Sequence, residues 1–150
     1  KTAHIIHNSL QKDFGIQNPR ISVAGLNPHA SEGGNIGRED IDNVVPWIAE
    51  LQAQGLSITG PNSADTMFHD VARLRYDVAL CMYHDQALIP IKTLDFSGGV
   101  NVTLGLPIVR TSPDHGTALD IAGKGSADPT SMIQAIRTAD NMIKARKDAN

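Results

Sequence analysis

The sequence predicts an α/β fold, in which a largely parallel β-sheet carries helices on its faces. The main observation is that short runs with strand character alternate with longer helical runs along the 150 residues. A second observation is that glycine ends the first strand, at Gly25, and the long helix that follows it, at Gly55. No internal repeat and no low-complexity linker interrupts this alternation.

The elements follow in order along the chain. It opens in a run typical of a helix already under way, and the first strand is predicted at 21–25. A turn-rich segment then leads to a helix at 38–54, which has one apolar face. The remaining predicted elements are a strand at 56–59, a helix at 64–73, a strand at 78–83, a short helix at 86–94 interrupted by Pro90, a buried strand beginning near Asn101, and a last helix at 129–147.

Composition and charge favour a soluble globular protein. The chain has 41% hydrophobic residues, a formal charge of −3 and no basic runs, which argues against nucleic acid as a partner. It has neither a signal peptide nor an apolar stretch of about 20 residues, so no membrane association is expected. Cys81 lies in an apolar run and is interpreted as a small buried hydrophobe, which favours a cytoplasmic location. Because the chain opens at Lys1 inside a predicted helix, we expect a fragment of a longer protein.

Polar residues follow each of four predicted strands. They are Asn27-Pro28-His29, the segment 60–65, His84-Asp85-Gln86 and the region 101–120. In a parallel sheet, ligands bind outside the carboxyl ends of the strands. The sequence therefore predicts a site at one edge of the sheet.

His29 and His84 are the candidate metal ligands. Neutral imidazole is a common ligand for Zn and similar ions, and two strand-end loops can converge on one ion. A catalytic ion generally takes about three protein ligands, so the third must come from a segment outside the chain, a partner subunit, Asp65 or Asp85. The alternative is that each histidine only caps a turn by hydrogen bonding.

Lys92, Asn101 and Arg110 are the candidate anion-binding residues. An ammonium, an amide and a guanidinium suit a phosphate or a carboxylate. The alternative for Lys92 and Arg110 is an ordinary surface charge or salt bridge. Asn101 is more informative, because it interrupts an otherwise apolar strand.

The glycine-containing loop after Asp114 is the candidate nucleotide site. It differs from the Gly-x-Gly-x-x-Gly fingerprint, so spacing alone does not identify its ligand. Such a loop can wrap an adenosine, and Asp120 can accept hydrogen bonds from a ribose diol, which disfavours a 2′-phosphate. The alternative is a glycine-rich turn that leads into the last helix.

Four motifs in this order resemble the C-terminal half of the 4-hydroxythreonine-4-phosphate dehydrogenase family, whose members act in pyridoxal phosphate biosynthesis. The motifs are Asn27-Pro-His-Ala, Met82-Tyr-His-Asp-Gln86, Asn101-Val-Thr-Leu-Gly-Leu-Pro and Arg110-Thr-Ser-Pro-Asp-His-Gly-Thr-Ala. The match covers almost the whole chain. The segment 115–125 is also similar to the adenosine-binding loop of isopropylmalate and isocitrate dehydrogenases.

The resemblance implies a three-layer α/β/α fold like that of these two dehydrogenases, in a two-domain protein about twice as long. It implies a homodimer with its site in the interdomain cleft near the subunit interface. Residues 1–150 would be the C-terminal portion, with substrate, metal and dimerisation functions in about 1–110, and the cofactor loop and last helix in about 111–150. Without the N-terminal half, we expect little or no activity from this piece and an exposed apolar surface that dimerisation covers.

The resemblance also implies roles for individual residues. His29 and His84 would bind Zn, Mg or Co together with a third histidine from the N-terminal half. The substrate would be bound by Asp65, Lys92, Asn101 and Arg110, and NAD, or alternatively NADP, by His115, Gly116, Thr117, Ala118 and Asp120. No residue is assigned as the catalytic base.

The implied reaction is oxidation of 4-phosphooxy-L-threonine, followed by decarboxylation to 3-amino-2-oxopropyl phosphate. One alternative is a paralogue that oxidises threonate or erythronate 4-phosphate, for which the same phosphate and metal residues would serve. The other is a noncatalytic binding or dimerisation module.

Overall fold

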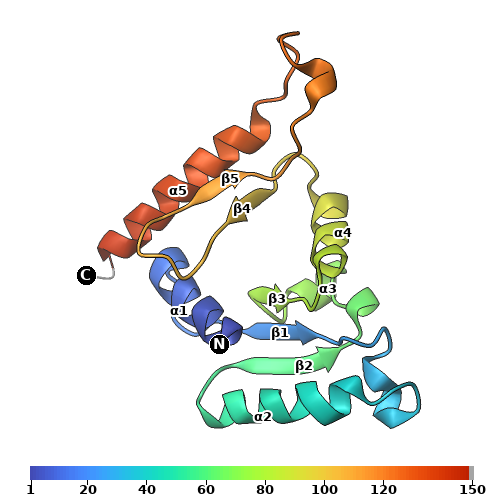
Figure 1. Ribbon diagram of the computed structural model, residues 1–150. Coiled ribbons are helices and arrows are strands. Elements are labelled where there is room, and N and C mark those ends of the chain that lie inside the picture. Colours follow the sequence, from blue (N-terminus) through green and yellow to red (C-terminus); the bar gives the residue numbers. More distant parts are fainter. Residues whose placement is uncertain (149–150) are drawn as a thin grey trace.

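The computed structural model describes residues 1–148 and confirms an α/β protein with a parallel sheet. Three strands form this sheet in the order β2-β1-β3, with β1 at Ile21–Ala24, β2 at Ile58–Asn62 and β3 at Val78–Leu80. The central strand β1 runs parallel to both neighbours (Figure 1). Because all four residues of β1 are buried, this central strand is covered on both faces of the sheet.

Helices supply the layers on either side of β1. Helix α1, at Thr2–Phe14, ends at Gly15, whose φ of 68° forms a left-handed cap. Helix α2, at Val45–Ala53, continues from a π-helical turn at Asp40–Val44. Figure 1 shows α2 below the sheet and α1 above it. The core joins these layers through Ala3, Ile6, Leu10, Ile21, Val23, Val44, Ile48, Leu51 and Ile58.

The segment 64–73 differs from its prediction as one helix. It forms a 3₁₀ turn at Ala64–Thr66 and a separate short helix, α3, at Asp70–Arg73. His69 breaks the run because its backbone is extended, and its Nδ1 accepts a hydrogen bond of 3.4 Å from Ala72 N. A local side-chain hydrogen bond thus competes with helix continuation.

Helix α4, at His84–Leu94, is longer than predicted and continues through Pro90. Proline has no N–H, so it cannot donate to the carbonyl four residues earlier, on Gln86. Cys81 Sγ instead donates to Gln86 O at 3.7 Å. This contact provides one partner for the carbonyl that Pro90 leaves without its helical donor.

The fourth strand does not join the parallel sheet. Strand β4, at Val100–Val102, pairs antiparallel with β5, at Thr111–Pro113, and Asn101 lies opposite Ser112. The pair packs on α5, at Thr130–Asp148, where Thr111 Oγ1 donates to Ala135 O at 2.9 Å. The prediction that four strand ends share one sheet edge is therefore wrong for the fourth.

In residues 1–148, no helix is both long enough and apolar enough to cross a bilayer.

Candidate functional site

The loop after β1 is held by a buried carboxylate. Asp40 has no exposed surface, and its two oxygens accept hydrogen bonds from Leu26 N at 2.8 Å and Asn27 N at 3.0 Å. Burying a carboxylate is favourable only when such bonds compensate for lost hydration. Asp40 therefore fixes the direction in which the chain leaves β1.

The side chain of Asn27 holds the next part of this loop, as far as His29, in place. Its Oδ1 accepts the main-chain N–H of His29 at 2.9 Å, and its Nδ2 donates to Ile36 O at 2.6 Å. The turn that follows, Ala30–Gly34, has five successive residues with positive φ. This conformation is strained for residues that carry a side chain. The imidazole of His29 is exposed beside it.

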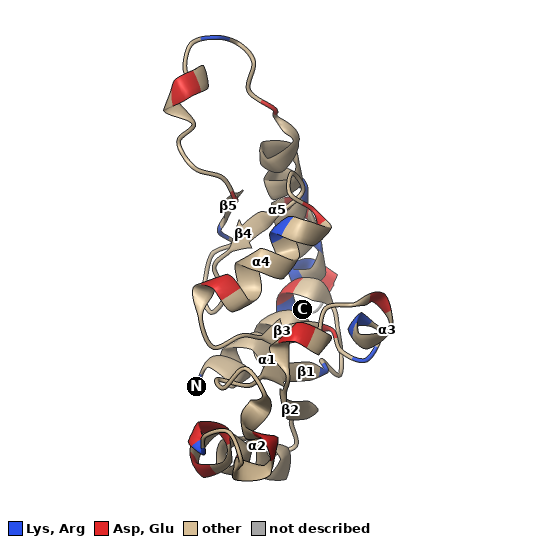
Figure 2. Cartoon of the chain, turned by 90° about the vertical axis from the view of Figure 1, so that its right-hand side faces the viewer, with Lys and Arg blue, Asp and Glu red and all other residues tan. Residues whose placement is uncertain are grey.

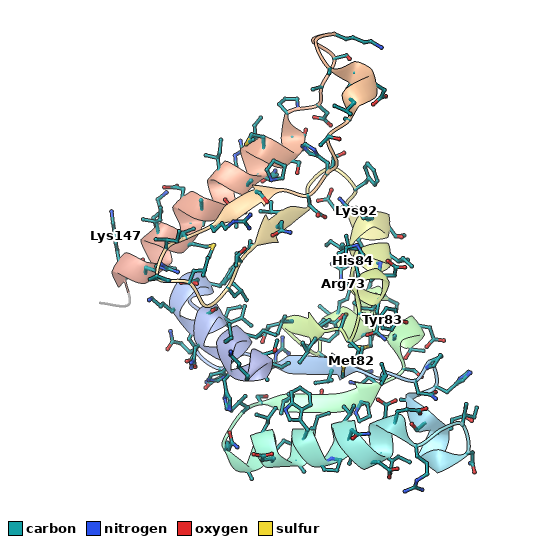
Figure 3. The ribbon with its side chains drawn as sticks, viewed as in Figure 1. Arg73, Met82, Tyr83, His84, Lys92 and Lys147 are labelled. Carbon is teal, nitrogen blue, oxygen red and sulfur yellow. The ribbon has the colours of Figure 1, made fainter. Side chains whose placement is uncertain are left out.

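Gln86 joins the loop after β1 to the loop after β3. It is 7% exposed, its Nε2 donates to Gly25 O at 2.8 Å, and its Oε1 accepts from Met82 N at 2.7 Å. His84 opens α4 two residues before Gln86, and its side chain is exposed (Figure 3). The two candidate metal ligands thus follow neighbouring parallel strands whose ends share a buried link.

These two imidazoles fit a metal site as donors but do not complete one. Within the part of the chain that the structure describes, no side chain donates a hydrogen bond to His29 or His84. The same part contains no group of three or more His, Cys, Asp and Glu residues placed to hold an ion. An ion bound by both histidines therefore needs a further ligand from outside this arrangement.

Lys92 forms an ion pair near the far end of α4. Its Nζ lies 2.9 Å from Asp114 Oδ2, donates also to the main-chain oxygen of Asp114, and lies 5.3 Å from the centre of the Phe96 ring. The salt-bridge alternative is thus realised for Lys92 in this structure. Asn101 and Asp114 line the same cavity of about 350 Å³, between α4 and β4.

The structure separates the other two predicted substrate residues from this cavity. Arg110 Nη1 donates to Thr103 Oγ1 at 2.7 Å, where Thr103 directly follows β4 and Arg110 directly precedes β5. Asp65 lines a different cavity of about 370 Å³, where Tyr83, Asp85 and Thr93 are among its neighbours. Lys92 and Asn101 are therefore close to one cavity, but the four predicted substrate residues do not surround a single cavity.

The predicted cofactor loop projects from the rest of the protein between β5 and α5 (Figure 1). A cavity of about 460 Å³ at its base is lined by His115, Gly116 and Ala118. Thr117 and Asp120 are exposed on the same loop, outside that lining. Figure 2 shows both acidic and basic residues on the projecting segment.

Asp128 closes the loop where α5 begins. Its Oδ1 accepts hydrogen bonds from Thr130 Oγ1 at 2.6 Å and Thr130 N at 2.9 Å. These bonds stabilise the charged form, so the pKa of Asp128 lies below its usual range. The carboxylate lines the cofactor-loop cavity and brings negative charge to it at neutral pH.

Sequence reasoning missed the residues that hold this site together. Asp40, Gln86, Asp114 and Ser131 act through contacts between segments far apart in the chain. Gln86 belongs to the motif Met82-Tyr-His-Asp-Gln86, in which only His84 and Asp85 were considered as functional residues. Its position in the first turn of a helix that starts at a strand end was the available signal.

Comparison with known proteins places these features in a family. The sequence profile described as "Pyridoxal phosphate biosynthetic protein PdxA" matches residues 1–139. The chain belongs to the PdxA family. It is 65% identical over 142 residues to the 4-hydroxythreonine-4-phosphate dehydrogenase of Roseobacter denitrificans, covering 95% of this chain and 44% of the relative. The Methylorubrum populi enzyme of the same name is 59% identical over 150 residues, covering 100% and 42%.

Solved structures of two differently named dehydrogenases have a similar fold. The crystal structure of 4-hydroxythreonine-4-phosphate dehydrogenase from Klebsiella pneumoniae has a TM-score of 0.81 at 44% identity, covering 93% of this chain and 42% of that one. A terephthalate 1,2-cis-dihydrodiol dehydrogenase from Burkholderia xenovorans has a TM-score of 0.71 at 36% identity, covering 93% and 44%. The chain thus spans less than half the length of the PdxA relatives it matches.

Proposed function

We propose that this chain is part of a dehydrogenase that oxidises 4-phosphooxy-L-threonine with NAD. The product, 2-amino-3-oxo-4-phosphooxybutanoate, then loses carbon dioxide to give 3-amino-2-oxopropyl phosphate in pyridoxal phosphate biosynthesis. The observation that carries this proposal is the 65% identity to a relative of that name, over 95% of the chain. The placing of two exposed histidines after neighbouring strands supports it.

In this proposal, the cationic and amide side chains hold the substrate. Lys92 and Asn101, beside one cavity, bind the phosphate, and Arg110 binds phosphate or carboxylate. Asp65 orients the substrate from the other side of α4. Together they would turn the C3 hydrogen toward the nicotinamide, so that hydride passes to the cofactor and the hydroxyl proton to a base that we do not assign.

His29 and His84 would hold a divalent ion such as Zn, Mg or Co. Such an ion supplies Lewis-acid chemistry, which lowers the pKa of a bound hydroxyl group and stabilises negative charge. The hydrogen bonds of Asp40, Asn27 and Gln86 keep the two loops in place before the ion binds. The third ligand belongs to the part of the protein that this chain does not span.

The loop 115–120 would bind the adenosine half of the cofactor. His115, Gly116 and Ala118 line the cavity at its base, and Thr117 and Asp120 lie further along the loop. A carboxylate facing a ribose diol favours NAD over NADP. A cytoplasmic homodimer, with its site near the subunit interface, completes the proposal.

Two other functions remain as alternatives. The Burkholderia xenovorans neighbour is named for a different, unphosphorylated substrate, so this architecture occurs with more than one substrate class. A paralogue that oxidises threonate or erythronate 4-phosphate is the second candidate, because the same phosphate and metal residues would serve it. A noncatalytic binding or dimerisation module is the third, and the separation of Asp65 from the cavity near Lys92 favours it.

The test uses an extended protein, in which this chain is joined to the part of the Roseobacter denitrificans relative that it does not match. We expect NADH formation with 4-phosphooxy-L-threonine, and less with the hydroxy-acid phosphates. Calorimetry should show Zn binding that is lost in the His29→Ala, His84→Ala double variant. The matched control is His4→Ala, which removes an imidazole on α1.

Each alternative has its own outcome. Preferred turnover of threonate or erythronate 4-phosphate would support the paralogue. Cofactor and metal binding without turnover of any of these substrates would support the noncatalytic module. Zn binding that is equal in the wild-type protein and the double variant would refute the metal assignment while leaving the family membership intact.

A further inference from the structure

Asp114 lies where two cavities meet. It lines the cavity that contains Asn101, and it also lines the cavity at the base of the cofactor loop with His115 and Gly116. In the described part of the chain, Asp114 is the residue that these two linings share. A movement of Asp114 would therefore change the lining of both cavities.

The two ends of Asp114 are held by different helices. Its carboxylate and its main-chain oxygen both contact the ammonium of Lys92 on α4, and the two side chains are only 23% and 24% exposed. Its main-chain N–H donates to Ser131 Oγ on α5 at 3.2 Å. Ser131 Oγ is itself buried and donates to Gly99 O at 2.9 Å. Asp114, the first residue after β5, is thus anchored to both α4 and α5.

Under the proposed function, an incoming phosphate engages Lys92, whose ammonium contacts the cavity-lining residue Asp114. An ammonium has three donors, and in this structure two of them are directed at Asp114. A phosphate carries more negative charge than a carboxylate and more acceptor oxygens. Phosphate binding in the cavity beside Asn101 therefore competes with Asp114 for the same ammonium.

We propose that Asp114 is a positioning residue that holds Lys92 while the anion cavity is empty and releases it when phosphate binds, which changes the start of the cofactor loop. This inference rests on the proposed function, because it takes Lys92 as a phosphate ligand and 115–120 as the cofactor loop. By linkage, a change in the loop on phosphate binding also changes cofactor affinity in the phosphate-bound protein.

The test is a titration of the extended protein with inorganic phosphate. Calorimetry gives the phosphate affinity, and amide NMR of nitrogen-labelled glycine follows Gly116, Gly123 and Gly125 in the loop. In the wild-type protein we expect these three amides to shift as phosphate binds. In Asp114→Asn the charged competitor is gone and only the main-chain oxygen still accepts from Lys92, so phosphate should bind about twofold to fivefold more tightly, the size expected for one partly exposed ion pair. The loop amides should then shift less on phosphate binding than in the wild-type protein.

Two further variants separate this role from a structural one. Asp140→Asn is the matched control, because Asp140 forms an exposed pair with Lys144 at 2.6 Å on α5, outside both cavity linings. It should titrate like the wild-type protein. Asp114→Glu restores a carboxylate and should restore the response of the loop amides, which a general loss of packing would not predict.

The outcomes distinguish this inference from the proposed function. Unchanged or weaker phosphate binding in Asp114→Asn overturns the inference, as do loop amides that are silent in the wild-type protein while phosphate binds. A wild-type protein that oxidises 4-phosphooxy-L-threonine but gives either result keeps its function and loses this coupling. A protein that neither binds phosphate nor oxidises 4-phosphooxy-L-threonine loses both.

Discussion

The side-chain amide of Gln86 donates a hydrogen bond of 2.8 Å to the main-chain oxygen of Gly25, which lies 61 positions earlier in the chain. The other end of the same amide accepts from Met82 N. One buried side chain thus joins the end of β1 to the segment that links β3 with α4. The loops carrying His29 and His84 leave from these two points, so their spacing depends on a contact that involves neither histidine.

The first prediction concerns Gln86→Ala. The substitution leaves the buried Gly25 O and the partly buried Met82 N without these partners, which costs about 1–3 kcal/mol of unfolding free energy for each lost pairing that water cannot replace. Urea denaturation of the chain should show this loss, and Zn affinity of the extended protein should fall as well. Gln54→Ala is the control, since Gln54 is exposed and bonds only to Glu50 Oε1 at 3.2 Å through its side chain. Equal stability of the two variants would contradict the structural role of Gln86.

Local patterns predicted much of this fold. The strand at 21–25, the helix at 38–54 and the helix at 129–147 each lie within a few residues of the observed elements. They could be predicted because the buried face of a helix or strand requires apolar residues at a regular spacing along the sequence. The same patterning located His29 and His84 at strand ends, where the structure has them.

Long-range contacts explain what the sequence did not reveal. The apolar run after Asn101 suggested one buried strand, yet the chain turns back after Val102 and pairs with Thr111. Gly105, whose φ is 77°, and Pro107 lie between the two strands and are turn signals, but they do not reveal that the resulting pair packs against α5. The roles of Asp40 and Asp114 were hidden for the same reason, since their partners lie 13 to 22 positions away.

The second prediction concerns the ion pair between α1 and α5. Arg146 Nε lies 2.6 Å from Asp13 Oδ1, Asp13 is 4% exposed, and Arg146 Nη1 also donates to Pro107 O at 2.9 Å. Removing the arginine in Arg146→Met leaves a buried carboxylate without its charged partner. We expect a loss of about 1–3 kcal/mol or more in unfolding free energy, measured by urea denaturation at neutral pH.

The exposed pair Asp140 and Lys144 provides the control for this prediction. Its side chains are 58% and 67% exposed, so Lys144→Met should change the unfolding free energy by less than about 0.5 kcal/mol. An Arg146→Met variant as stable as Lys144→Met would mean that the link between the two helices contributes nothing to stability.

The third prediction concerns acid stability. Arg20 binds Asp77 through two side-chain hydrogen bonds, of 2.8 and 3.0 Å to its carboxylate oxygens, and through its main-chain N–H. These bonds hold the pKa of Asp77 below its usual range. A carboxylate with a lowered folded-state pKa stabilises the fold above its unfolded pKa of about 4, and this contribution is lost as pH falls further.

Melting temperatures between neutral pH and about pH 2 test this sign. The wild-type chain should lose stability as Asp77 is protonated, and Asp77→Asn should lose less over the same interval. The control is Asp70→Asn, because that side chain is 98% exposed and lies 3.6 Å from Arg73. If Asp77→Asn and the wild-type chain have parallel curves below pH 4, the Arg20 pair does not contribute to acid unfolding.

The fourth prediction concerns Cys81. Burial raises the pKa of its thiol, and Sγ donates to Gln86 O. Because the thiolate is the reactive species, the folded chain at neutral pH should react with a disulfide reagent more slowly than the urea-unfolded chain does. The rate for the folded chain should rise as pH increases, since more thiolate forms. Equal rates for the folded and unfolded chains at neutral pH would show that the fold neither blocks access of the reagent to Cys81 nor raises the pKa of its thiol. A slow rate that stays independent of pH would show that access alone, and not the thiol pKa, protects it.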